Sequence, residues 1–206
     1  MKIVRLPLLL AALTLAGCAS LLGKPQPFTI YAPGYSPPTA PAGGEKVNWQ
    51  LLVETPQSSE TLNTPRIVVM PSPGVIEVYP GARWSDPAPA LLRRLIVQGF
   101  EQSGRILGVG SPTTGLNADY ALAIDLHAFQ GEVRADGSHA VVAFQARLLD
   151  YRSSRVLASR AFNADEPIAS KDSAAAFNAF QSAVSESVAS LVEWTLQEGS
   201  AAQKSR

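Results

Sequence analysis

Apolar residues recur at helical spacing in two stretches of the chain. In residues 87–103 the apolar face consists of Leu91, Leu92, Leu95, Ile96, Gly99 and Phe100. In residues 172–197 a single stripe consists of Phe177, Phe180, Val184, Val188, Leu191, Val192 and Thr195. Such stripes are typical of amphipathic helices that bury one face. Asp86 stands where a capping residue is favoured, Pro87 where a helix begins and Gly104 where one ends. The sequence therefore predicts two main helices.

Short runs rich in β-branched and aromatic residues predict strands in the first half of the chain. These runs are residues 47–53, 66–70 and 75–79. The second and third flank Pro71-Ser72-Pro73-Gly74, which is a turn sequence, so we expect them to form a hairpin.

Alternation of apolar and polar residues predicts a longer strand after residue 119. One face holds Tyr120, Leu122, Ile124 and Leu126, and the other holds Asp119, Ala121, Ala123, Asp125 and His127. Asp136-Gly137 predicts a turn, and residues 140–150 predict a second strand that returns antiparallel to the first. After a turn at residues 151–154, residues 155–162 predict a third strand.

These elements predict a single domain of the α/β or α+β class, in which a mixed or antiparallel sheet is covered by the two main helices. We place this domain at residues 47–197 and a polar tail at residues 198–206. Trp194 lies off the apolar stripe of the closing helix, so we expect it to be partly exposed or to touch the membrane or another subunit.

The first residues have the three parts of a secretory signal. Basic residues come first, an apolar run follows, and small residues precede Cys18. Leu15-Ala16-Gly17-Cys18 also resembles the bacterial lipobox, in which the cysteine thiol is acylated and the chain is cleaved immediately before it. The resemblance implies a lipoprotein signal peptide at residues 1–17 and lipidation of Cys18, and Ala19 implies the outer membrane. The alternative is an unlipidated secreted protein in which Cys18 is a small buried hydrophobe.

Residues 18–46 are dense in proline and glycine, which excludes regular helix and predicts a tether. Only Phe28-Thr29-Ile30-Tyr31 interrupts this composition with strand-like residues. We expect this short strand, residues 28–31, to pair at a sheet edge.

Composition narrows the function classes. The chain has 206 residues, of which 46% are hydrophobic and 17% charged, as in a globular protein with a sizeable core. Seventeen basic residues balance 17 acidic ones, so no overall field attracts nucleic acid. Cys18 is the only cysteine, which excludes an intramolecular disulfide and a multi-thiolate metal site. We expect no nucleic-acid partner, cofactor or metal.

Several segments together resemble one protein family. Residues 79–87, followed by the leucine-rich helix, resemble the tyrosine, arginine-tryptophan and W-x-[DE]-P segment of the ABC-type transport auxiliary lipoprotein family, also called the paraquat-inducible intermembrane transport lipoprotein family. The resemblance extends to residues 118–122, 148–150 and 156–160 and to the closing helix. Phe28-Thr29-Ile30-Tyr31 departs from the Y-Y-x-L opening of the family.

The resemblance implies a non-catalytic component of an ABC-powered system that transports lipid between membranes. In such systems a protein with mammalian-cell-entry domains bridges the periplasm, and the auxiliary lipoprotein on the periplasmic face of the outer membrane receives it. A homo-oligomer is compatible with this arrangement. Two rival functions stay open at this point: a carrier that holds an acyl chain in its interior, and a periplasmic hydrolase.

The hydrolase alternative depends on two histidines. His127 and His139 lie on or beside adjacent predicted strands, and Asp125 shares a face with His127, so a Ser-His-Asp arrangement is conceivable. However, the sequence contains no G-x-S-x-G, no glycine-rich phosphate loop and no H-E-x-x-H. We therefore interpret both histidines as surface residues and predict no catalytic or metal site.

Tyr79, Arg83 and Trp84 are the candidate partner-contact residues, because aromatic residues and arginine are favoured at interface hot spots. For Trp84 the alternative is packing at the start of the helix as a core anchor, which we favour.

Overall fold

The computed structural model describes residues 27–37 and 44–205. Within this part of the chain, a nine-stranded mixed sheet is accompanied by two α-helices, which confirms the predicted fold class. The elements in chain order are β1 (Thr29–Tyr31), β2 (Gln50–Val53), β3 (Gln57–Ser58), β4 (Arg66–Ser72), β5 (Val75–Trp84), α2 (Ala88–Ser103), β6 (Gly108–Gly110), the 3-10 turn η1 (Pro112–Thr114), β7 (Tyr120–Arg134), β8 (Gly137–Asp150), β9 (Val156–Ile168) and α3 (Ser173–Lys204).

β7 is the central strand of the sheet. On one side it pairs antiparallel with β8, which pairs antiparallel with β9, so the predicted three-stranded meander is present. On its other side β2, β3 and β4 pair with it in parallel, one after another along its length. β5 returns antiparallel beside β4, and β1 pairs in parallel with β5 at the sheet edge, as expected for the short strand near residues 28–31.

A bulge in β7 changes which residues face the core. The pairing of β7 with β8 shifts between Leu126 and Ala128, so His127 has no directly opposite partner. Before the bulge, even-numbered residues such as Leu126 are buried, and after it Phe129 is buried. A bulge inserts one extra residue and thereby reverses the alternation between the two faces. His127 itself is exposed.

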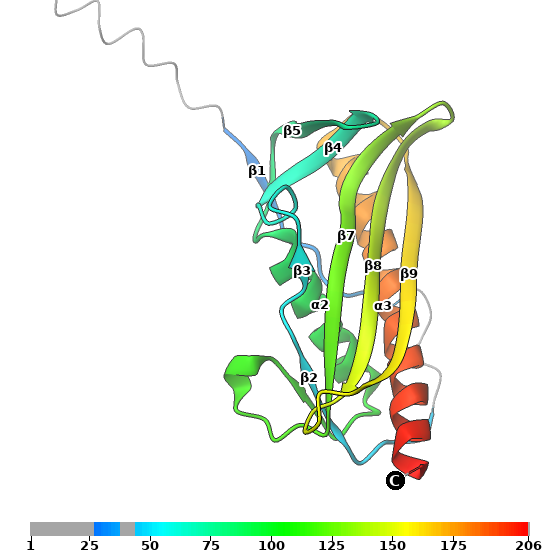
Figure 1. Ribbon diagram of the computed structural model, residues 1–206. Helices are drawn as coiled ribbons and strands as arrows, with labels where there is room; N and C mark the ends of the chain where they lie inside the picture. Colours follow the sequence, from blue (N-terminus) through cyan, green and yellow to red (C-terminus); the bar gives the residue numbers. More distant parts are fainter. Residues whose placement is uncertain (1–26, 38–43, 206) are drawn as a thin grey trace, which may run out of the picture.

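The two helices lie side by side on one face of the sheet (Figure 1). The space between the layers is filled by large side chains. The Trp84 ring meets the rings of Phe129 and Phe180 edge-on, at centroid distances of 5.7 and 5.2 Å, while Phe129 and Phe180 stack at 5.4 Å. α2 and α3 approach closely at Gly99, where a Cβ would lie 2.6 Å from Val188 Cγ1.

Both helices differ from the prediction at one end. α2 begins at Ala88 with Pro87 as its N-cap, so the expected cap by Asp86 is wrong. The Asp86 carboxylate instead accepts a hydrogen bond from the Ser85 hydroxyl at 2.9 Å. α3 continues to Lys204, past the end predicted from its apolar stripe. The extra turns are held because Gly199 is buried and its carbonyl accepts a hydrogen bond from the Tyr120 hydroxyl at 3.2 Å.

Trp194 is buried, with an exposed fraction of 5%, contrary to the expectation of partial exposure. Its ring packs edge-on against Phe162 of β9 at a centroid distance of 5.7 Å. Because α3 contacts β8, β9 and α2, the surface that this helix buries is wider than one stripe.

Candidate functional site

The three candidate contact residues lie on β5, near the edge that it forms with β1. In the parallel register Ile30 pairs with Arg83, and Tyr31 pairs with Trp84. Paired residues share a face of the sheet and neighbours along a strand point to opposite faces. Trp84 and Tyr31 therefore point toward the helices, and Arg83 and Ile30 point outward.

Trp84 is a core residue in this structure, with an exposed fraction of 1%. Its ring contacts the two phenylalanine rings, and its backbone N–H donates a hydrogen bond to the carbonyl of Pro65 at 2.7 Å. This position agrees with the interpretation of Trp84 as a packing residue. Any contact that this segment makes with a partner therefore falls to Arg83 and Tyr79.

Tyr31 fastens the β1 edge to the closing helix. Its ring stacks on Phe177 at a centroid distance of 5.0 Å, and its hydroxyl lies 3.0 Å from the Ser173 hydroxyl, within hydrogen-bond distance. Farther on, the backbone N–H of Gly34 donates to the Gln181 side chain at 3.1 Å. Both β1 and Gly34 are therefore bound to the domain, although our predicted domain begins at residue 47.

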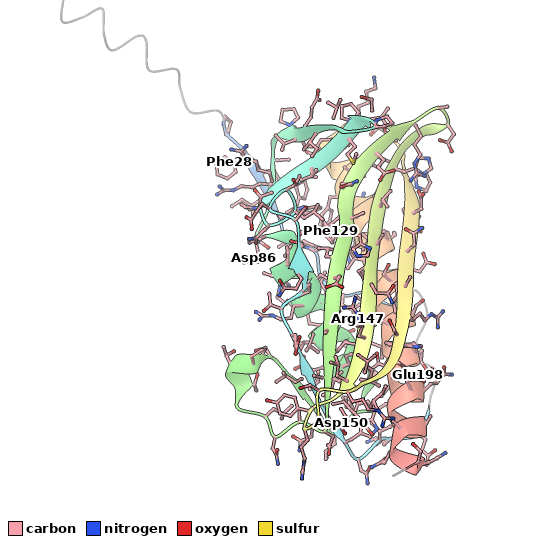
Figure 2. The ribbon with its side chains drawn as sticks, viewed as in Figure 1. Phe28, Asp86, Phe129, Arg147, Asp150 and Glu198 are labelled. Carbon is pink, nitrogen blue, oxygen red and sulfur yellow. The ribbon has the colours of Figure 1, made fainter. Side chains whose placement is uncertain are left out.

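Arg83 is exposed, and its guanidinium carbon lies 3.7 Å from the centroid of the Phe28 ring. Phe28 is 49% exposed and lies where the chain enters the described fold (Figure 2). A cation over an exposed aromatic face contributes about 0.5–1 kcal/mol. The pair thus leaves both side chains accessible to another molecule.

Tyr79 occupies the boundary between core and surface. Its ring is half-buried and lies against Gly131 of β7, 3.7 Å from the position that a Cβ there would take. Burial raises the pKa of the Tyr79 hydroxyl, and the negative charge of Asp172 raises it further. The three candidate residues therefore do not converge: one is buried, one lies at the boundary and one is exposed.

The same end of the molecule carries exposed apolar side chains that the sequence analysis did not select. These are Ile30, Val75, Ile76 and Val78, with exposed fractions of 54%, 45%, 53% and 42%. The near-continuous apolar run at residues 75–78 indicates a strand, but an apolar run does not show whether the strand is exposed or buried.

The structure does not bring the two histidines together. His127 lies exposed on the bulge, and nearby Asp125 forms an ion pair with Arg147 of β8 at 2.7 Å. His139 lies farther along β8, opposite Glu132. A hydrolase would need Asp125 to orient His127, but the Asp125 carboxylate is instead engaged in a cross-strand ion pair with Arg147.

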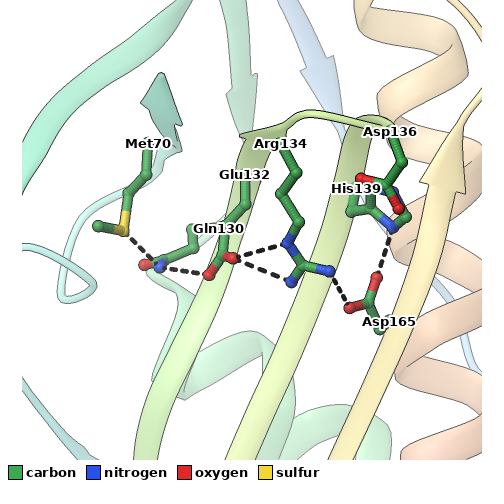
Figure 3. A network of polar contacts seen from close by, with 7 residues as sticks. All are labelled: Met70, Gln130, Glu132, Arg134, Asp136, His139 and Asp165. Carbon is green, nitrogen blue, oxygen red and sulfur yellow. Dashed lines mark hydrogen bonds and ion pairs between the residues drawn. The ribbon is translucent and has the colours of Figure 1, made fainter. Parts of the chain in front are cut away.

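His139 belongs to a polar network on the outer face of β7, β8 and β9 (Figure 3). Its Nδ1 lies 2.6 Å from Asp165 Oδ1, and its Nε2 lies 3.5 Å from Asp136 Oδ2. Arg134 connects this part to Glu132 at 2.9 Å and also donates to Asp165. Arg134 lies between the carboxylates of Glu132 and Asp165, which is the arrangement of a structural ion-pair network.

The network shifts two pKa values. Burial acts to raise the pKa of Asp165, but hydrogen bonds from Arg134 and His139 outweigh it and lower that pKa below its ordinary value. The hydrogen bonds to Asp165 and Glu132 raise the pKa of Arg134. Both shifts favour the charged forms, so Arg134 and Asp165 remain ionised at neutral pH.

The lipidation prediction at Cys18 lies outside the described residues. In the part of the chain that the structure does describe, no helix is long and apolar enough to cross a membrane. The same residues contain no group of three or more histidine, cysteine or carboxylate side chains arranged to hold a metal ion.

Comparison with known proteins reveals close structural relatives. A crystal structure of a protein from Xanthomonas campestris, assigned to the family DUF330, is 38% identical and has a TM-score of 0.80, and the match covers 85% of this chain and 99% of that one. A crystal structure of an uncharacterized protein is 16% identical, with a TM-score of 0.63 over 81% of this chain and 97% of that one, and shows the same fold.

Sequence comparison adds a relative and a family. An uncharacterized protein of Bradyrhizobium diazoefficiens is 29% identical over 151 residues, which are 71% of this chain; the chain spans 39% of that protein's length. Since the family model described as the ABC-type transport auxiliary lipoprotein component matches residues 32–192, the chain belongs to this family, as the sequence resemblance predicts.

Proposed function

We propose that this protein is a lipoprotein on the periplasmic face of the outer membrane, where it serves as the non-catalytic auxiliary component of an ABC-powered system that moves lipid between membranes. Its partner is a transport protein with mammalian-cell-entry domains. The observation that carries the proposal is the family match over residues 32–192, in a chain whose Cys18 follows a lipobox-like sequence. The acylated cysteine is the membrane attachment.

The polar groups favour a binding role over hydrolysis. A catalytic histidine must have one ring nitrogen free to take a proton from a nucleophile. Both ring nitrogens of His139 face carboxylates, those of Asp165 and Asp136. His127 is exposed on a bulge, and Asp125 is engaged by Arg147.

The packing of the interior favours a binding role over an acyl-chain carrier. A carrier needs apolar space between its layers, whereas here aromatic rings from β5, β7 and α3 contact one another across that space. At the other end of the layers, the ring of Trp49 meets that of Tyr120 edge-on at 5.2 Å. A hollow of about 420 Å³ lies on the surface and is lined by Asn117, Ala118, Asp119, Asp150 and Arg152, a set dominated by polar groups that would not hold an acyl chain.

Among Tyr79, Arg83 and Trp84, we propose that Arg83 makes the partner contact. The half-buried Tyr79 and the buried Trp84 fix the position of β5, which carries Arg83. Arg83 is exposed and presents its charge beside an aromatic ring. Arginine and aromatic groups are the residues that most often dominate binding energy at protein interfaces.

Co-purification tests the function and the contact. The full-length lipoprotein is extracted from membranes in mild detergent, and its companions are identified by mass spectrometry. We expect a protein with mammalian-cell-entry domains, reduced at least tenfold for Arg83→Ala and unchanged for Arg155→Ala, a matched exposed arginine in the β8–β9 connection. Absence of such a protein from the wild-type sample would overturn the proposed function. Equal recovery with Arg83→Ala would overturn only the proposed contact.

A further inference from the structure

Four exposed apolar residues at the β1–β5 end share one face of the sheet. Ile30 pairs with Arg83, which points outward, and Val78 pairs with Val68, which pairs in turn with Gln130 of the outer-face network on β7. Since paired residues and residues two apart share a face, Ile30 and Val78 both point outward.

One residue is added on each side. Phe28 precedes β1, and its ring lies against the outward-pointing Arg83, while Ile76 is two positions before Val78 in β5. We call this set, Phe28, Ile30, Ile76 and Val78, the apical patch; its members are 42% to 54% exposed. Glu77 lies on the opposite face of β5, so the charged side chain beside the patch is the cation of Arg83, which covers the Phe28 ring.

The edge of β5 beside the patch is also open. β1 pairs with β5 only at Ala82, Arg83 and Trp84. Among the described residues, the first part of β5 therefore has β4 on one side and no hydrogen-bonded strand on the other. Soluble proteins normally protect such an exposed apolar edge. Its presence here requires an occupant.

The position of the anchor identifies the occupant. Pro27 lies beside β5, with its carbonyl oxygen 3.8 Å from the position that a Cβ on Gly81 would take. Cys18 precedes Pro27 by a short segment, and residues 18–27 span at most roughly 30–35 Å even if fully extended. With Cys18 acylated, Pro27 and the end of the apical patch next to β1 therefore lie within that distance of the membrane surface.

The length of the domain fixes which end faces the membrane. α3 has 32 residues and so extends about 48 Å. It begins at the end that carries β1 and β5 and finishes at the opposite end, near the C-terminus (Figure 1). Because this length exceeds the reach of the anchor segment, the opposite end cannot be turned to the same membrane while β1 remains paired with β5.

We propose that the apical patch rests in the lipid surface of the membrane that holds the acyl anchor, so that β5 lies at the bilayer and α3 stands away from it. This inference depends on the lipidation of Cys18 in the proposed function. It also places Arg83 at the membrane surface. A transport protein bound to Arg83 would therefore lie directly beside the lipid that it delivers or collects.

The single cysteine provides a clean experiment. Acylation blocks the thiol of Cys18, so in the mature lipoprotein a cysteine introduced by Ile76→Cys is the only site for a thiol-reactive, polarity-sensitive NBD probe. Leu107→Cys is the matched control, because Leu107 is 65% exposed and precedes β6 at the far end of the domain. Both labelled proteins are reconstituted into vesicles of phosphatidylethanolamine and phosphatidylglycerol, with or without nitroxide-labelled lipid.

We expect the probe at position 76 to become several-fold brighter on reconstitution and to be quenched by the nitroxide lipid, while the probe at position 107 does neither. Equal, water-like emission at both positions in protein that floats with the vesicles would overturn the inference and leave the anchor intact. A probe at position 76 that is shielded without vesicles, increasingly so at higher protein concentration, would overturn it in favour of a second copy. Labelling of the wild-type protein, or failure to float, would instead refute the anchor.

Discussion

Gly199 of α3 lies directly against the indole of Trp49, and a Cβ on Gly199 would stand 2.5 Å from Trp49 Cζ2. Trp49 is 1% exposed and cannot move aside without disturbing Tyr120. The contact therefore explains why a glycine is tolerated inside a long helix.

Gly199→Ala should destabilise the domain. Alanine favours helix by about 1 kcal/mol over glycine, but overpacking a core typically costs about 1–3 kcal/mol, and here the clashing atom belongs to a rigid ring. We expect a lower melting temperature by circular dichroism. Ser200→Ala in the same helix is the control and should melt at or above the wild-type temperature. A Gly199→Ala protein that melts higher than wild type would show that Trp49 yields easily.

Trp84→Ala and Arg83→Ala should separate folding from binding. Removing the buried indole should cost about 3–5 kcal/mol, as for other large aromatic core residues. Removing the exposed guanidinium should cost no more than about 1 kcal/mol. Urea unfolding of the two variants measures both quantities. A Trp84→Ala protein with wild-type stability and no partner binding would identify Trp84 as an interface residue.

The stability contribution of Asp165 should depend on pH. Its folded-state pKa is lowered, so the carboxylate stabilises the fold above its unfolded pKa of about 4, and this stabilisation is lost as the pH falls through the lower folded value. Asp165→Asn should therefore lower the melting temperature at pH 7, and the difference from wild type should shrink below pH 4. Asp136→Asn, at the more exposed carboxylate, should show a smaller difference throughout. A difference that grows toward low pH would contradict the assigned role of Arg134 and His139.

Cys18→Ser should give a folded protein that no longer partitions with outer membranes. The acyl attachment is lost, whereas the described fold begins only at residue 27. Density-gradient fractionation measures the location, and circular dichroism confirms that the melting temperature is unchanged. Intact mass spectrometry of the wild type checks the premise: an unmodified thiol at Cys18 in membrane-extracted protein would refute lipidation.

Local sequence patterns predicted the meander because its strands are neighbours in the chain and its alternation is regular. They could not predict that β2, β3 and β4 would share one side of β7, since no periodicity encodes which distant strands pair. The predicted strand ends at residue 79, yet β5 continues to Trp84, because its register with β4 shifts between Val78 and Arg83 and so accommodates Pro80 and Gly81.

The candidate site was predicted only in part. The segment around Trp84 was found from its residue types, but whether each side chain points inward or outward depends on the register with β1 and β4. The apical patch escaped notice because an exposed apolar strand and a buried one have the same composition. Only the position of β5 at the sheet edge distinguishes them.

The pairing of β2 and β3 with β7 has a consequence for biogenesis. A ribosome makes the chain from its N-terminus, so these two strands appear long before residues 120–134, which form the strand with which both pair. Until then Leu51 and Val53, which are both fully buried in the folded domain, lack the neighbouring strand β7. Closure of such distant contacts is slow and exposes the chain to aggregation. A chain made in this order therefore carries β2 and β3 without their β7 neighbour until the second half of the sheet arrives.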